Sequence, residues 1–61
     1  MLELSKHILE RVSFDKKLFK KELLKAVKWL QKEDALLLKV WCLTNFTVYK
    51  SIIVSVFRGL A

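Results

Sequence analysis

The stretch KKLFKKELLKAVKWLQK, residues 16–32, contains seven lysines, one glutamate and regularly spaced apolar residues. If each residue advances a helix by 100°, the apolar side chains gather on one side. That side comprises Phe19, Leu23, Ala26, Val27 and Leu30. We therefore predict an amphipathic helix from about Asp15 to Gln31, with this apolar side facing a core.

The same helical geometry collects the lysines on the opposite side. Five of them fall within an arc of about 80°, two more extend it, and they form a stripe about 22 Å long. Like charges four residues apart repel each other in a helix, so a stripe of one sign carries a cost. It is typical of a surface that meets an anionic partner, although a solvated basic face without a specific partner is the alternative. The five are Lys17, Lys21, Lys25, Lys28 and Lys32, and the two others are Lys16 and Lys20.

Two further helices are predicted on either side of this one. Residues 2–12 have apolar residues at steps of four, namely Leu4, Ile8 and Val12, with Leu9 beside them. In the break that follows, Ser13 or Asp15 is suited to cap the next helix. Residues 31–45 form the other helix, whose predicted apolar face consists of Leu36, Leu37, Val40, Trp41 and Thr44, widened by Leu38 and Cys42.

The segment FTVYKSIIVSVF, residues 46–57, fits two kinds of secondary structure. Its β-branched residues favour a strand, whereas the spacing of Ile52, Ile53, Val56 and Phe57 also fits a helix that ends at Gly59. A single strand in a helical chain leaves its backbone groups without partners. We therefore expect a helix here.

Composition supports an all-α fold. The 61 residues include one glycine and no proline, so the turns that a sandwich or barrel needs are nearly absent. We predict a single domain, residues 1–61, folded as a small bundle of three to four short helices. Cys42 is the only cysteine, which excludes an internal disulfide, and the first residues lack the pattern of a secretory signal. We expect a cytoplasmic protein.

The net charge of +6 is unevenly distributed. Residues 1–34 contain all six acidic residues, and residues 35–61 contain only three charges, all basic. A membrane span over residues 36–57 would have the right length, but Lys39 and Lys50 lie inside it and are costly in a bilayer. We therefore expect no membrane partner. A peripheral membrane protein that uses the basic helix of residues 15–31 is a further hypothesis.

No catalytic or metal-binding pattern is present. His7 is the only histidine, and no cysteine or acidic residue stands at metal-ligand spacing from it. Cys42 lies among apolar residues and is expected to be a small buried side chain. We predict that the protein is not an enzyme and that it has no cofactor, no metal site and no catalytic residues.

The aromatic residues mostly fall on apolar faces and are expected in the core. Trp29 is the exception, because it borders the lysine stripe. It is a candidate for stacking on an RNA base or ribose. The alternative, a half-buried tryptophan at the rim of the core, is favoured.

Residues 5–42, SKHILERVSFDKKLFKKELLKAVKWLQKEDALLLKVWC, resemble short, uncharacterised, Lys-rich bacterial proteins. They are also similar to a lineage-specific small protein of the large ribosomal subunit. This resemblance implies a structural role, in which a small helical body is pressed against ribosomal RNA.

We therefore expect a ribosomal component that docks on ribosomal RNA and touches neighbouring ribosomal proteins. Its predicted RNA-binding residues are the seven lysines of residues 16–32 and Trp29, where lysines would contact phosphates without selecting a base sequence. The alternative is a helical interaction module that binds a partner helix or a second copy of itself through surplus apolar surface.

Overall fold

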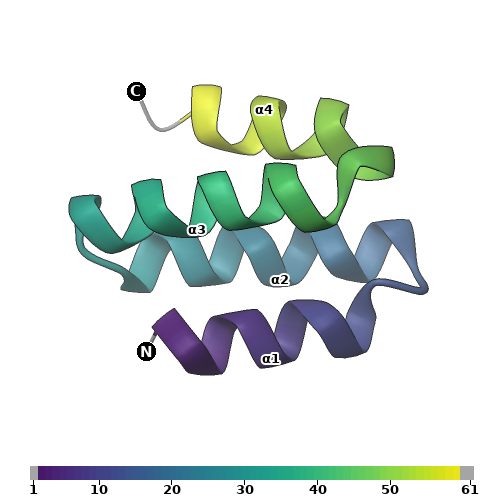
Figure 1. Cartoon of the computed structure of the whole chain (residues 1–61), viewed down its shortest axis with the longest axis horizontal. Helices are drawn as coiled ribbons and strands as arrows, with labels where there is room; N and C mark the ends of the chain where they lie inside the picture. Colours follow the sequence, from purple (N-terminus) through teal and green to yellow (C-terminus); the bar gives the residue numbers. More distant parts are fainter. Residues whose placement is uncertain (1, 60–61) are drawn as a thin grey trace.

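The computed structural model describes residues 2–59, which form four α-helices and one short 3-10 helix (Figure 1). No strand occurs within these residues. The prediction of a small all-α bundle is confirmed, and the segment after Asn45 is helical rather than extended. The elements are α1 (Leu2–Val12), α2 (Lys16–Trp29), α3 (Lys32–Asn45), η1 (Thr47–Tyr49) and α4 (Lys50–Arg58).

The four α-helices occupy the corners of a square. α1 packs against α2 and α3, and α4 packs against the same two helices. α2 therefore lies diagonally across from α3, and Figure 1 shows it behind α3 with α1 and α4 on either side. The axis turns by 111° between α3 and the segment Thr47–Arg58, which carries α4 back over the bundle.

The start of α2 is fixed by Asp15, one of the two caps expected from sequence. Its Oδ1 accepts hydrogen bonds from the backbone N–H groups of Lys17, at 2.9 Å, and Leu18, at 3.2 Å. These two groups would otherwise lack partners at a helix start. The carboxylate also lies at the positive end of the helix dipole, where a negative charge is favourable.

All four α-helices contribute side chains to a continuous core. The fully buried side chains include Leu9 of α1, Leu38 of α3 and Ile53 of α4. Phe19 of α2 lies at the centre, where its ring centre is 5.0 Å from that of Phe46 and 4.8 Å from that of Tyr49. Each of the four α-helices is thus held mainly by its contacts with the others, as expected for helices this short.

A hydrogen bond joins the beginning of α2 to the end of α3. The hydroxyl of Tyr49, in η1, donates to the backbone carbonyl of Ser13 at 2.6 Å. Ser13 lies in the turn that leads into α2, so this bond ties together segments that are 36 positions apart in the sequence. It therefore links the segment just before α2 to the segment just after α3.

The structure corrects the predicted faces of two helices. In α1 the buried residues are Ser5 and Leu9, whereas Leu4 and Ile8 are exposed. In α3 the buried residues are Leu38 and Cys42, which were expected only to widen the face, and Trp41 is partly buried against the core. The rest of the predicted face is exposed. Both helices carry more apolar residues than one side can bury, so the packing partners decide which side faces inward.

Among the described residues, no single helix is both long enough and apolar enough to cross a membrane. α3 and the segment Thr47–Arg58 meet the criteria of length and composition only as a pair that is bent by 111°.

Candidate nucleic-acid interface

Five lysines of α2 surround a shallow hollow on the surface of the bundle. Its floor is the side chain of Leu24, the residue that interrupts the predicted stripe. All five lysines are exposed, and the buried residues of α2 lie on the other side of the helix. We call this surface the lysine face; it consists of Lys17, Lys20, Lys21, Lys25 and Lys28 around Leu24.

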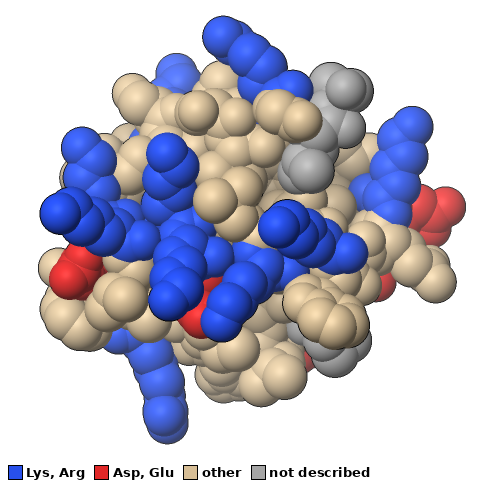
Figure 2. All heavy atoms as spheres, turned by 180° about the vertical axis from the view of Figure 1, so that it is seen from behind, with Lys and Arg blue, Asp and Glu red and all other residues tan. Residues whose placement is uncertain are grey.

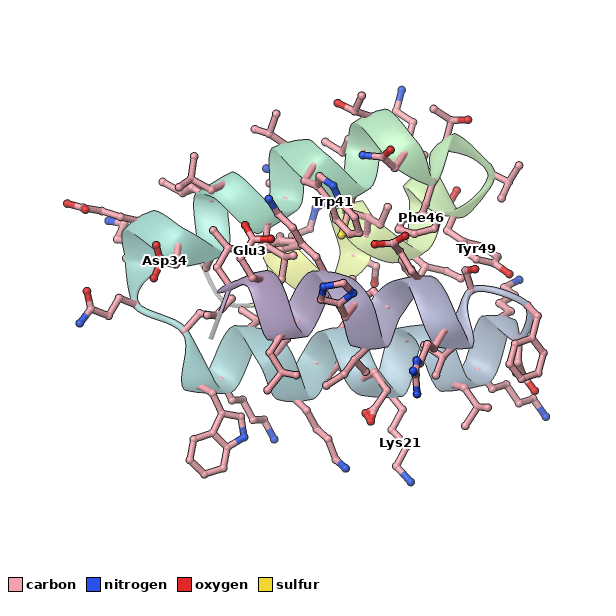
Figure 3. All side chains as sticks on the ribbon, turned by 60° about the horizontal axis from the view of Figure 1, so that its bottom comes forward. Glu3, Lys21, Asp34, Trp41, Phe46 and Tyr49 are labelled. Atoms are coloured by element: carbon pink, nitrogen blue, oxygen red, sulfur yellow. The ribbon has the colours of Figure 1, made fainter. Side chains whose placement is uncertain are left out.

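Figure 2 views the molecule from behind and shows basic side chains crossing this face, with few acidic groups between them. Figure 3 shows Lys21 pointing away from the bundle, on the side opposite α3 with its Trp41. The lysine face therefore lies open to solvent. Because the apolar side of α2 is buried in the bundle, the folded protein does not offer that side to lipid.

The ends of the predicted stripe differ from expectation. α2 ends at Trp29, so Lys32 belongs to α3 and does not continue the stripe. Lys16 is exposed at the start of α2 but does not line the hollow. The stripe along α2 runs from Lys16 to Lys28 and spans about 18 Å at 1.5 Å per residue, somewhat shorter than predicted.

The positive charge of the lysine face is almost uncompensated. Among the described residues, the only ion pair on this face joins Lys25 to Glu22 at 3.8 Å. Within α2, three lysine pairs are four residues apart and two are three residues apart. Each such pair costs about 0.2–0.5 kcal/mol. The five pairs together therefore oppose folding by roughly 1–2.5 kcal/mol.

Trp29 is much more exposed than a tryptophan at the rim of a core. Its exposed fraction is 76%, so the favoured prediction of a half-buried side chain is wrong. The indole lies at the last residue of α2 and, with Lys25, lines a second depression. The structure thus brings Trp29 next to the lysine face.

This second depression is a groove between α1 and α2. Leu4 and Ile8 of α1 form one wall, and Ala26 and Trp29 of α2 form the other. Ser5, Glu22 and Lys25 complete the lining. Its volume is about 230 Å³, below the range of roughly 300–1,000 Å³ typical of sites for drug-sized ligands. The groove has room for one small ring system.

Sequence reasoning missed two exposed features. Phe14, expected in the core, precedes the cap of α2 and is 80% exposed. The other feature is what we call the α3 outer face, made of Leu36, Leu37 and Val40, whose exposed fractions lie between 53% and 63%. The sequence shows that these residues and the buried Leu38 are all apolar. When a helix is apolar on several sides, the pattern does not indicate which side faces outward.

Cys42 lies on the inner side of α3 and is fully buried. Burial disfavours the thiolate and raises the pKa of the thiol from 9.0 to about 12. The side chain is therefore a neutral thiol at physiological pH. Within residues 2–59, no three His, Cys, Asp or Glu side chains lie close enough together to hold a metal ion.

No family model, curated protein or solved structure matches this chain. The ribosomal resemblance therefore stays a prediction, and the function is inferred from the geometry and charge of the lysine face.

Proposed function

We propose that the protein binds RNA through the lysine face, as a non-enzymatic structural component of a ribonucleoprotein, with the ribosome as the expected assembly. The observation that carries the proposal is the concentration of five exposed lysines around one hollow, with a single partial ion pair among them. A surface that served only solubility would mix charges of both signs.

The chemistry of lysine suits a phosphate backbone. Each ammonium group is a flexible point charge with three donors, and it binds phosphate without fixing the identity of a base. Binding would also screen the repulsion among the lysines. The expected result is an affinity that depends strongly on salt and weakly on sequence.

The test is the salt dependence of binding to a folded RNA such as ribosomal RNA. Five phosphate contacts predict a slope of log K against log salt of about −3.5 to −4.5. Replacement of Lys17, Lys21 and Lys28 by Gln should make the slope shallower by about 2 to 3. The matched control removes three positive charges elsewhere, at Arg11, Lys39 and Lys50, and should change the slope much less.

Association with the ribosome is tested by co-sedimentation. The protein should sediment with ribosomes at low salt and be released at high salt, and the triple Gln variant should remain in the supernatant. Binding that is insensitive to salt, or that the triple variant retains in full, would contradict the proposal.

A second candidate function is a helical protein-protein interaction module, and the α3 outer face favours it. Three large apolar side chains lie together on the outer side of α3, and each is more than half exposed. Sedimentation equilibrium tests this candidate: a stable homo-oligomer without nucleic acid, disrupted by Leu37→Glu, would support it over RNA binding.

A further inference from the structure

We propose that the groove between α1 and α2 holds one unpaired nucleobase, stacked on Trp29, so that the protein prefers single-stranded RNA to duplex RNA. This inference rests on the proposed binding of RNA by the lysine face. It adds a base-binding site beside the phosphate-binding surface and commits to one occupant, an unpaired base whose own phosphates lie on the lysines.

The lysine face and the groove adjoin at Lys25. Lys25 lines both the hollow of the lysine face and the groove. A strand whose phosphates follow the lysines along α2 would therefore bring a base to the mouth of the groove. The positive charge at this edge complements a nucleotide, which is a flat apolar ring attached to an anion.

The lining of the groove suits a flat ring. Leu4, Ile8 and Ala26 offer apolar contacts to the faces of a ring, and the indole of Trp29 offers a stacking surface. Aromatic stacking is how proteins that bind single strands engage bases, because every base has a π-face. The volume of about 230 Å³ admits one ring system rather than a larger ligand.

The groove also offers hydrogen-bonding groups to the polar edge of a base. Glu22 and Lys25 both line the groove, and the 3.8 Å between their charged atoms is too long for a hydrogen bond. The carboxylate can therefore accept, and the ammonium can donate, a hydrogen bond to groups on a base. Both groups can therefore form hydrogen bonds to a base while the ion pair between them persists.

Duplex RNA cannot use these features. Its bases are stacked on one another, and its major groove is too deep and narrow for side chains to reach them. A duplex would contact the lysines through its phosphates, and Trp29 would not stack on any of its bases. A comparison of single-stranded and duplex RNA therefore distinguishes the contribution of the base site to affinity from that of the phosphate-binding lysines.

The experiment compares the affinities of wild type and Trp29→Ala for a single-stranded oligonucleotide, oligo(U), and for a duplex of the same length. The variant should bind oligo(U) roughly 5- to 150-fold more weakly, the value of one lost stacked base, and bind the duplex with unchanged affinity. Phe14→Ala is the matched control, because it removes an equally exposed ring that does not line the groove. It should have a much smaller effect on oligo(U).

A spectroscopic measurement locates the base independently. In a Trp41→Phe background, Trp29 is the only tryptophan, and its fluorescence should be quenched by oligo(U) and not by the duplex. Equal losses of affinity for the two RNAs in Trp29→Ala, or an equal loss of oligo(U) binding in Phe14→Ala, would overturn the inference. So would a Trp29 fluorescence change on vesicles of anionic lipid that exceeds the change with oligo(U).

The two proposals fail in different ways. If the triple Gln variant loses oligo(U) binding and Trp29→Ala does not, the base site is wrong and RNA binding by the lysine face stands. If wild type binds neither RNA at low salt, both are wrong.

Discussion

The lysine face of α2 and the outer face of α3 lie on diagonally opposite corners of one bundle, and they differ in almost every property. The first consists of charges that repel each other, whereas the second is apolar and carries almost no charge. Neither contributes to the core. The contrast shows that a bundle of this size can fold although two of its surfaces contribute nothing to the core. The residues on these two surfaces are therefore free to contact a partner.

The first prediction compares the effect on stability of a substitution in the core with that of a substitution on the α3 outer face. Phe19→Ala should cost about 3–5 kcal/mol, because it empties the buried centre of the aromatic cluster. A domain of this length has a total stability of roughly 3–9 kcal/mol, so much of the population should unfold. Leu37→Ala on the α3 outer face should change the stability by less than about 0.5 kcal/mol. Urea unfolding followed by circular dichroism measures both, and a large loss in Leu37→Ala would show that the outer face is structural.

The second prediction concerns the hydrogen bond between the turn that precedes α2 and η1, which follows α3. Tyr49→Phe removes the hydroxyl that donates to the carbonyl of Ser13 and should cost about 1–2 kcal/mol. Hydrogen exchange should then increase at both ends of the link, in the turn before α2 and in η1. Exchange that rises in only one of these segments would mean that the bond does not couple them.

The third prediction contrasts the two sides of α3. The outer face has no titrating group, whereas Cys42 on the inner side keeps its proton to about pH 12 when folded. Unfolded chains lose that proton above about pH 9, so the unfolded state is favoured as the pH rises from there. The free energy of unfolding should fall with a limiting slope of about 1.4 kcal/mol per pH unit from this group. Cys42→Ala lacks this contribution, and an identical pH dependence in wild type and variant would contradict the prediction.

The fourth prediction measures the repulsion within the lysine face. Lys21 has lysines four residues away on both sides, at Lys17 and Lys25. Without RNA, Lys21→Gln should therefore stabilise the protein by about 0.4–1 kcal/mol at low salt. Salt should reduce this gain, because it screens exposed charges. Lys39→Gln is the control, since no lysine lies three or four residues from it, and a similar gain there would point to net charge rather than local repulsion.

The part of the site that lies on one helix could be predicted from the sequence. The spacing of the lysines in residues 16–32 places them opposite Phe19 and Leu23 in any regular helix. Asp15 was likewise predictable as a cap, because its carboxylate accepts hydrogen bonds from backbone N–H groups only two and three residues further along the chain. Only the exact end of α2, and hence the position of Lys32, escaped this reasoning.

The parts that depend on two helices could not be predicted in this way. α1 offers Leu4 and Ile8 on one side and Leu9 on another, and it buries the side that carries Ser5 and Leu9. That choice exposes Leu4 and Ile8 and creates the groove next to Trp29. α3 is apolar nearly all round, so only its contacts with α1 and α4 determine that Leu38 faces inward.

The diagonal placement of α2 and α3 also gives the molecule a defined thickness. One helix with its side chains is about 10–12 Å across, and the principal extents of the fold are 26, 22 and 19 Å. Molecules held at the two corners would be kept about 2 nm apart by a rigid layer two helices deep. They could be bound at the same time without touching each other, and the spacing between them would be set by the core rather than by a flexible linker.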